Sequence, residues 1–423
     1  MPYTLISSVG TGMYKDGYRQ TTYTFPDGKT FETRLFLEAI LKCKYREIDS
    51  VILVGTQTSS WDALVDNSID NDLWEQVFSA TNQGEGIDGA NPLIHRLEEY
   101  LSNRFANIKF IIKIHTDKVD FDTAESIFKT YNSLVPTIKK ENHVLFDITH
   151  GFRSMPILLY QALQYSFTQS ESLQNVELVY GEYNINTRIS IVRNLSDYWF
   201  YSQVADAVLI FKNKLDGSRL STLLKGKYTS LAKKISYFTE IVQTNSSLQF
   251  ENFLSQLNNI NLSQIKGPFW LNDVVDFLKE IAKLKAKSRA RTLYNLSGFF
   301  LNKKLNVQAV ITLQLAVETA FAEKYGDSDS VGNYDWWSDF KKMKDGIEQS
   351  SKRDRVIDGF PFSPDERKSL CRQLALLEHG RNSIAHGGAK NKGAKGFPQP
   401  SNIPGVYERG KKGVVTLLEL LKL

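Results

Sequence analysis

The chain has 423 residues, of which 42% are hydrophobic, so it is long enough for two or three domains with separate cores. Its 52 basic and 47 acidic residues give a net charge of +5, which permits an acidic partner without requiring one. The two cysteines, Cys43 and Cys371, lie far apart and outside any CxxC motif, which argues against a disulfide scaffold or a structural zinc site. Because the sequence shows neither a secretory signal nor an apolar segment of about 18 residues, we expect a cytoplasmic protein without a membrane span.

The first 200 residues alternate short β-branched segments with amphipathic segments, which is typical of an α/β domain with a parallel sheet covered by helices. The predicted strands are residues 4–9, 50–54, 108–114, 143–148 and 176–180. The predicted helices between them are residues 32–41, 93–105, 123–138 and 157–166. We also expect residues 189–192 to pair with the last strand as a hairpin at the edge of the sheet.

From about Asp197 onward the alternation stops and helical periodicity dominates, so the second half is predicted to be all-α. The predicted helices are residues 204–211, 231–241, 274–284, 307–325 and, after a flexible basic loop that ends at residue 404, 414–421. A basic helical stretch, residues 279–291, is interpreted as a solvated face, with contact to RNA phosphates as the alternative. The predicted domains are residues 1–200, a helical connecting region 201–290, and 291–423.

Loops with phosphate-binding composition follow three of the predicted strands. In an open parallel sheet ligands bind beyond the carboxyl ends of the strands, where glycines let the backbone approach a phosphate and hydroxyl groups donate to its oxygens. We therefore predict a phosphate-rich ligand at this edge of the sheet. The candidate ligand-binding residues are Gly10, Thr11, Gly12, Thr56, Gln57, Thr58, Ser59, Ser60, Asp147, Thr149, His150, Gly151 and Arg153.

Two of these loops leave alternatives open. The dinucleotide fingerprint requires a third glycine where this chain has Lys15, so Gly10-x-Gly12 is a weak signal, and a plain turn between strand and loop is its alternative. His150 is expected at the ligand edge, because it lies between an apolar strand and a glycine. Its alternative role is structural, capping the next helix or bonding to a backbone carbonyl.

The segment Asp147-x-Thr149-His150-Gly151-Phe152-Arg153, with Gly10-Thr11-Gly12 upstream, resembles the CRISPR-associated DxTHG-motif proteins. The resemblance implies that about the first 200 residues form a CARF domain. Such a domain is a Rossmann-like sensor that dimerises and binds cyclic oligoadenylate made by type III CRISPR complexes. It further implies that the three loops surround this ring, for which cyclic tetra-adenylate is the first expectation, and that no other cofactor is required.

A helix is predicted to begin at Ser363-Pro364-Asp365-Glu366, where Ser363 is the N-cap and Glu366 completes a capping box. Its polar residues gather at the far end, around Arg381 and His386. Five residues correspond to about 140° around a regular helix, so the spacing alone leaves open whether the two side chains converge. The alternative is structural: Arg381 pairs with Glu378, and His386 helps to end the helix.

Arg381-Asn382-x-x-x-His386 matches the Arg-x4-His motif of the HEPN ribonucleases, and this resemblance covers roughly the last 130 residues. It implies that Arg381, Asn382 and His386 are catalytic. A His can transfer protons near neutral pH, and an Arg can stabilise a phosphorane, while the ribose 2′-hydroxyl supplies the nucleophile. Cleavage would need no metal and would leave 2′,3′-cyclic phosphate and 5′-hydroxyl ends. Since the chain carries one copy of the motif, the resemblance also implies a homodimer, or a higher oligomer of dimers.

The sequence thus predicts an endoribonuclease that is activated by cyclic oligoadenylate and cuts single-stranded RNA in antiviral defence. Asn382 is expected to orient the catalytic pair. Two rival functions remain open at this stage. One is a non-catalytic regulator that responds to the nucleotide, and the other is a phosphodiesterase that degrades its own activator in the N-terminal domain.

Overall fold

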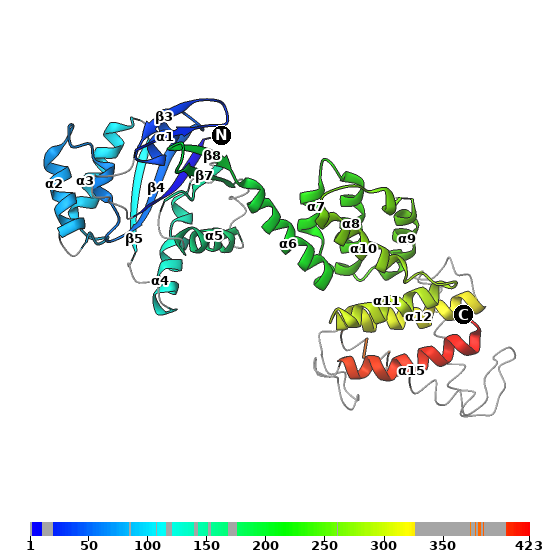
Figure 1. Cartoon of the computed structure of the whole chain (residues 1–423). Coiled ribbons are helices and arrows are strands. Elements are labelled where there is room, and N and C mark those ends of the chain that lie inside the picture. Colours follow the sequence, from blue (N-terminus) through cyan, green and yellow to red (C-terminus); the bar gives the residue numbers. More distant parts are fainter. Residues whose placement is uncertain are drawn as a thin grey trace. The chain divides into compact units, whose positions relative to one another are not determined.

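The chain divides into two compact units, Met1–Ser202 and Gln203–Leu423, in the computed structural model (Figure 1). The predicted three-domain division stays a prediction. The structure describes residues 2–10, 20–83, 86–106, 108–115, 121–138, 143–150, 154–167, 176–259, 261–325 and 403–423, together with Gln373, Leu377, Gly380, Arg381 and Ile384. The predicted helix start at Ser363 lies outside the described residues.

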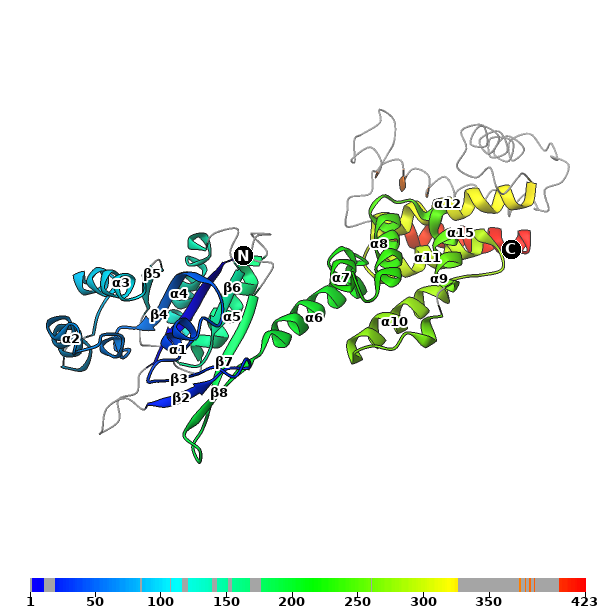
Figure 2. The ribbon, with the colours of Figure 1, turned by 90° about the horizontal axis from the view of Figure 1, so that it is seen from above.

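An eight-stranded sheet forms the centre of the first unit, with the strand order β3-β2-β8-β7-β6-β1-β4-β5 (Figure 2). The strands are β1 (Tyr3–Val9), β2 (Thr21–Thr24), β3 (Thr30–Thr33), β4 (Ile48–Thr56), β5 (Lys109–His115), β6 (His143–Asp147), β7 (Val176–Asn184) and β8 (Ile189–Asn194). The five strands from β7 to β5 in this order are parallel, whereas β2–β3 and β7–β8 are antiparallel pairs. The predicted parallel sheet and the antiparallel pairing of β7 with β8 are confirmed. The predicted position of this hairpin at the edge is wrong, because β2 pairs with β8 and β3 extends the sheet further.

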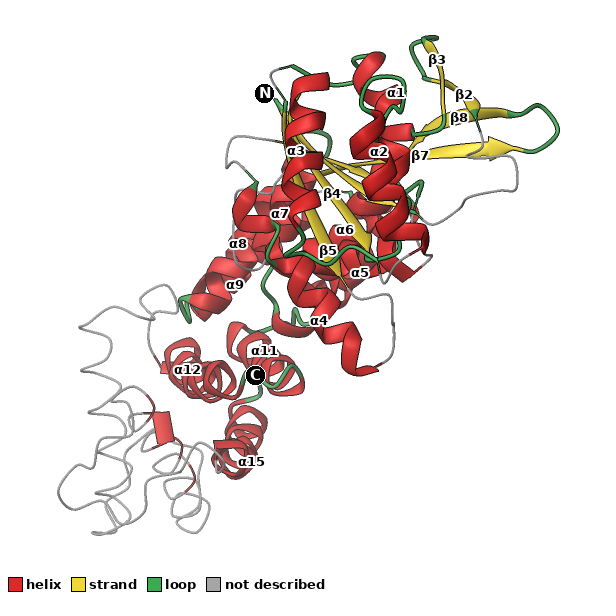
Figure 3. Ribbon diagram, turned by 90° about the vertical axis from the view of Figure 1, so that its left-hand side faces the viewer, coloured by secondary structure: helices red, strands yellow, loops and turns green. Residues whose placement is uncertain are grey.

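Helices cover both faces of the sheet, because successive strand residues point to opposite sides. In β1, Leu5 belongs to the core cluster that contains residues of α1 (Phe36–Lys42), α2 (Asn71–Phe78) and α3 (Pro92–Arg104). The next residue, Ile6, belongs to the cluster that contains residues of α4 (Phe121–Asn132) and α5 (Ser154–Phe167). Figure 3 shows α2 and α3 on the side of the sheet that faces the viewer. The predicted α/β fold of this half is confirmed.

The helix predicted over residues 32–41 is wrong at its start, because residues 30–33 form β3 and α1 begins at Phe36. A tight turn at Gly28 joins β2 to β3, with the Phe25 amide donating to the Lys29 carbonyl at 2.9 Å. Gly28 has a φ of +82°, a backbone conformation that residues with a side chain rarely adopt. The Pro-Asp-Gly sequence at residues 26–28 is a turn signal, and it predicts this hairpin when it is read together with the alternating residues of β2.

Three further predicted boundaries are wrong for local reasons. Residues 123–138 are not one helix, because α4 ends at Asn132 and a short 3₁₀ turn, Val135–Thr137, follows it around a proline. The basic stretch 279–291 is not one helix either, since Ser288 accepts a hydrogen bond from the Arg291 amide and starts a new helix. The last helix begins at Ile403 instead of residue 414. Pro404 lies in its first turn, where a helix tolerates proline, so this residue does not end the loop in the way that was predicted.

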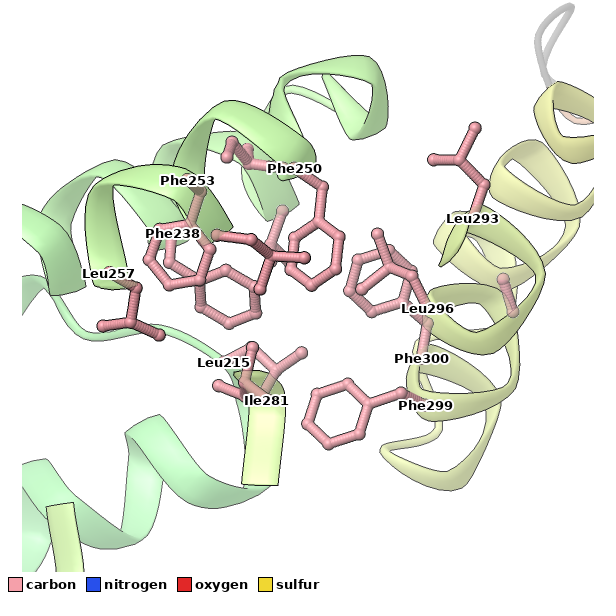
Figure 4. Close-up of a cluster of buried hydrophobic side chains, with 14 of the residues drawn as sticks. Leu215, Phe238, Phe250, Phe253, Leu257, Ile281, Leu293, Leu296, Phe299 and Phe300 are labelled. Carbon is pink, nitrogen blue, oxygen red and sulfur yellow. The ribbon is translucent and has the colours of Figure 1, made fainter. Parts of the chain in front are cut away.

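Where the structure describes the second unit, its regular elements are helices, as predicted, and these helices share one hydrophobic cluster. Its helices are α6 (Ser196–Lys214), which crosses the division between the units, α7 (Ser218–Leu224), α8 (Thr229–Gln243), α9 (Phe250–Asn258), α10 (Phe269–Ala282), α11 (Arg289–Asn302), α12 (Asn306–Tyr325) and α15 (Ile403–Leu421). Figure 4 shows phenylalanines of α8 and α9 facing those of α11 within this cluster. Of the helices that the structure describes, none combines the length and the apolar character of a membrane span.

The core phenylalanines should carry much of the stability of this unit. Phe238 is fully buried, and its ring lies 5.0 Å from that of Phe253. We predict that Phe238→Ala lowers the free energy of unfolding by about 3–5 kcal/mol, because it leaves a cavity among packed rings. Phe269→Ala, at a side chain that is 75% exposed, should change it by less than about 0.5 kcal/mol. Urea denaturation of both variants measures the difference, and equal losses would contradict this assignment of the core.

Candidate functional site

The carboxyl ends of β1 and β6 form a topological switch point in the sheet. The two strands are adjacent and parallel. The connection from β1 to β4 passes through β2, β3 and then α1, which packs on one face of the sheet, whereas the connection from β6 to β7 is α5 on the other face. In open α/β sheets the crevice between two such strands is where ligands bind. The sequence Asp147-x-Thr149-His150 begins at the last residue of β6 and therefore lies at this crevice.

A buried carboxylate joins the two strand ends. Asp147 is fully buried at the end of β6; its Oδ2 accepts a hydrogen bond from Ser7 Oγ of β1 at 2.6 Å. Its Oδ1 accepts another from the Thr149 amide at 2.8 Å. Burial raises the pKa of Asp147, while the hydrogen bonds from Ser7 and Thr149, and the charge that His150 carries when it is protonated, oppose that shift. The carboxylate thus fixes the loop that follows β6.

A cavity of about 320 Å³ opens at this edge of the sheet. Ser8 lines it and is 2% exposed, and its hydroxyl has no hydrogen-bond partner among the described residues. A buried hydroxyl without a partner is costly, so the cavity offers a donor that a bound ligand can satisfy. The residues that line it come from eight segments of the first unit: Ser7, Ser8, Val9, Gly10, Thr21, Tyr23, Arg34, Leu35, Leu37, Leu53, Ser60, Ala63, Leu64, Thr149, His150, Tyr180, Gly181, Tyr183 and Ser190.

His150 lines the cavity as a neutral imidazole. Its Nε2 accepts a hydrogen bond from the Phe36 amide at the start of α1, at 3.4 Å, and lies 3.5 Å from the Tyr23 hydroxyl. Burial lowers the pKa of His150, and the negative charge of Asp147 opposes this shift only in part. An accepting Nε2 places the proton on Nδ1, so the ring has one donor left.

Gly181 allows β7 to pass close to the loop after β6. Its amide donates a hydrogen bond to Thr149 Oγ1 at 2.8 Å. A Cβ at this position would approach a ring carbon of Tyr23 to 2.8 Å and the Thr149 methyl group to 3.2 Å. Glycine is therefore required here by close packing around the cavity, because a larger residue would push the two lining side chains apart.

The predicted ligand residues fall into distinct groups. Four of them line the cavity, and Asp147 accepts hydrogen bonds from two residues that line it, Ser7 and Thr149. Thr56 and Ser59 are buried, and both are used in structural hydrogen bonds: Ser59 Oγ accepts from the Thr56 amide at 2.8 Å and donates to the Val9 carbonyl at the end of β1 at 2.8 Å. Gln57 is half-buried and Thr58 exposed, and neither lines the cavity. The four lining residues are Gly10, Ser60, Thr149 and His150.

Four of the other candidate ligand residues, Thr11, Gly12, Gly151 and Arg153, lie outside the described residues.

Sequence reasoning missed the cavity-lining residues that come from β2, from β7 and from the segment before α1. Arg34 is the most informative of these, because a cationic residue lines the cavity while its Nη2 donates to the Val65 carbonyl at 3.0 Å. The alternation of Thr21 and Tyr23 in a short strand was a usable signal for the β2 contribution.

Arg381 lines a second cavity, of about 330 Å³, within the helical unit. It has helical backbone conformation and a half-buried side chain. The other lining residues include Gln314 and Glu318 of α12 and the loop of residues 245–249. The other two candidate catalytic residues, Asn382 and His386, lie outside the described residues.

Close contacts with α15 hold the backbone on which Arg381 lies. A Cβ at Gly380 would approach Val406 Cγ1 to 2.6 Å, and a Cβ at Gly410 would approach Leu377 Cδ1 to 2.9 Å. Glycines at both contacts let the two segments pack closely, which restricts the position of Arg381. Within the described residues no group of three or more His, Cys, Asp or Glu side chains is placed to hold a metal ion.

Residues 4–192 match the family model of the CARF domain of the CRISPR system endoribonuclease Csx1. Residues 4–192 form a CARF domain similar to those of CRISPR-associated proteins. This confirms the resemblance predicted from the Asp147-x-Thr149-His150-Gly151 motif, and it places the cavity at the ends of β1 and β6 inside the CARF domain. The match ends before the helical unit and leaves the assignment of that unit as a prediction.

Two relatives illustrate the likeness. The CRISPR-associated protein MJ1674 of Methanocaldococcus jannaschii is 24% identical over 310 residues, which cover 66% of this chain and 48% of the relative. The chain thus spans about half the length of this curated relative. A solved structure of Enterococcus italicus Csm6, bound to cyclic hexa-2′-fluoro-hexa-dAMP, covers 100% of this chain and 95% of its own, at 10% identity. Its TM-score of 0.42 is too low to support a conclusion about the site.

The lowered pKa of His150 gives a testable protonation state. Because folding lowers this pKa below the ordinary value of about 6.5, the folded protein should keep His150 neutral at pH 6.5 and protonate it only at lower pH. Nitrogen NMR of the protein with labelled histidine, assigned with a His150→Gln variant, should show a ring protonated on Nδ1 alone. A half-protonated ring at pH 6.5 or above would contradict this environment.

Proposed function

We propose that the chain is an endoribonuclease that cyclic oligoadenylate activates through the CARF domain and that cuts single-stranded RNA in the helical unit. The observation that carries the proposal is the position of Arg381. This arginine lines a cavity of a helical unit whose preceding unit is a CARF domain with a cavity of its own. An arginine beside a cavity suits a phosphodiester in reaction, because a guanidinium stabilises the charge that develops on phosphate oxygens.

The chemistry of the CARF cavity supports a phosphate-rich activator. Arg34 supplies positive charge, and Ser8 and the ring Nδ1 of His150 supply further donors. A cavity of about 320 Å³ lies at the lower end of the usual range for small-molecule sites, so a ring of four or more nucleotides extends beyond it. A second copy of the chain would complete the binding surface, which supports a homodimer. Cyclic tetra-adenylate, supplied by a type III CRISPR complex, remains the first expectation.

The proposed reaction uses groups of this chain and of the RNA. The ribose 2′-hydroxyl attacks the adjacent phosphorus, His386 transfers protons, Asn382 orients the pair, and Arg381 stabilises the phosphorane. The bond to the 5′-oxygen of the next nucleotide breaks, so the products are a 2′,3′-cyclic phosphate and a 5′-hydroxyl. Independence from metal ions is part of the proposal. Activation follows if the bound ring favours the arrangement in which two copies of the motif meet.

Cleavage of a fluorogenic single-stranded RNA in EDTA tests the catalytic assignment. With a mixture of cyclic tri-, tetra- and hexa-adenylate, wild type should cut the RNA, and Arg381→Ala and His386→Ala should each lower the rate by at least about 100-fold. Both variants should still bind the activating ring, because the changes lie outside the CARF domain. Arg409→Ala, which changes an exposed arginine on α15, serves as the matched control and should retain activity.

The outcome also separates the rival functions. Wild-type rates in the His386→Ala variant would contradict the proposed chemistry. Binding of a ring without any cleavage by wild type would favour a non-catalytic regulator. Linear adenylate products formed by an Arg381→Ala, His386→Ala double variant would instead assign degradation of the activator to the CARF domain.

A further inference from the structure

The cavity beside Arg381 has a wall that is fixed before any RNA binds. The Ser247 and Thr312 hydroxyls, both buried, lie 2.7 Å apart and join the loop of residues 245–249 to α12. Arg289 Nη2 donates to the Leu248 carbonyl at 3.1 Å, and the Arg289 amide donates to Glu323 Oε1 at 2.6 Å. These bonds join the loop to the start of α11 and the end of α12, so the wall is preorganised.

This wall presents hydrogen-bond acceptors. Gln314 is 5% exposed, and its Nε2 donates to Glu318 Oε1 at 3.3 Å, which fixes the orientation of the amide. Among the described residues nothing donates to Gln314 Oε1 or to Asn245 Oδ1, although both oxygens are buried. Both residues line the cavity. A buried acceptor without a donor destabilises a protein, so two of them beside one cavity indicate that a ligand supplies the missing donors.

We propose that the cavity is a base-binding subsite that selects a nucleobase with an exocyclic amino group beside the scissile phosphate. Adenine, cytosine and guanine each carry such an amine and can donate to Gln314 Oε1 and Asn245 Oδ1. Uracil has a carbonyl oxygen in place of the cytosine amine, so at that position it offers no amine to the acceptors and brings oxygen against oxygen. Arg381, on the same cavity, holds the adjacent phosphate. This inference rests on the proposed ribonuclease function and adds its base preference.

Substrates with one cleavable position test the subsite. We would use 2′-fluoro RNAs with a single ribonucleotide, so that only one 2′-hydroxyl can attack, and vary the bases on both sides of that phosphate. The assay contains the same mixture of cyclic tri-, tetra- and hexa-adenylate. At one of the two positions, adenine, cytosine or guanine should give a kcat/KM about 10-fold above uracil.

Variants of the two acceptors separate base selection from folding. Gln314→Met keeps the shape of the side chain without the oxygen, and it should lower kcat/KM about 10-fold for amine-bearing bases while leaving uracil substrates unchanged. Asn245→Gly removes the second acceptor at a residue whose φ of +56° glycine adopts without strain, and it should shift the preference in the same direction. Gln243→Met, at the exposed end of α8, is the control and should keep the wild-type preference.

A binding measurement distinguishes failure of this inference from failure of the proposed function. Fully 2′-fluorinated RNAs lack the nucleophile, and their affinity can be measured by fluorescence anisotropy. If wild type cuts every base equally, or Gln314→Met slows all substrates alike, the subsite is overturned while the ribonuclease function stands. If no RNA is cut, but amine-bearing RNAs bind more tightly and Gln314→Met removes the difference, the subsite stands and the ribonuclease function fails.

Discussion

The hydrogen bonds of the buried Asp147 carboxylate are the interaction on which the CARF cavity depends. They join Ser7 at the end of β1 to the Thr149 amide after β6, across the point where the chain turns to opposite faces of the sheet. A carboxylate in a buried position is tolerated only when donors surround it. Asp147 holds the Thr149 amide, and Thr149 Oγ1 accepts a hydrogen bond from the Gly181 amide of β7. Residues of β7 therefore form one side of the cavity.

The CARF cavity and the cavity beside Arg381 have opposite hydrogen-bonding character. The CARF cavity offers donors, including the Arg34 guanidinium and the unpaired Ser8 hydroxyl, and donors suit the oxygens of phosphates. The cavity beside Arg381 offers the acceptor oxygens of Gln314 and Asn245, which suit the amino groups of bases. This contrast fits a protein in which one unit recognises a nucleotide signal and the other recognises an RNA substrate.

Sequence reasoning predicted the elements whose periodicity and turn chemistry agree, namely the parallel strands, the β7–β8 hairpin and the long helices. It placed His150 and Gly10 correctly at the cavity, because both follow buried strands. It did not separate Thr56 and Ser59, which bond to each other and to the end of β1, from residues that line the cavity, since a hydroxyl group can serve either purpose. Arg34 was missed because the β2–β3 hairpin that brings it there depends on tertiary pairing with β8.

The central claim is that the cavity between β1 and β6 senses the ring that controls cleavage in the helical unit. Its most direct test is the rate of RNA cleavage against the concentration of the activating ring, for wild type, Arg34→Ala and Arg96→Ala. Arg96 is an exposed control outside the cavity, paired with Asp72. The account predicts that Arg34→Ala raises the half-maximal concentration by about 10-fold or more at an unchanged maximal rate, because a charged donor to phosphate is lost. An unchanged half-maximal concentration would contradict it.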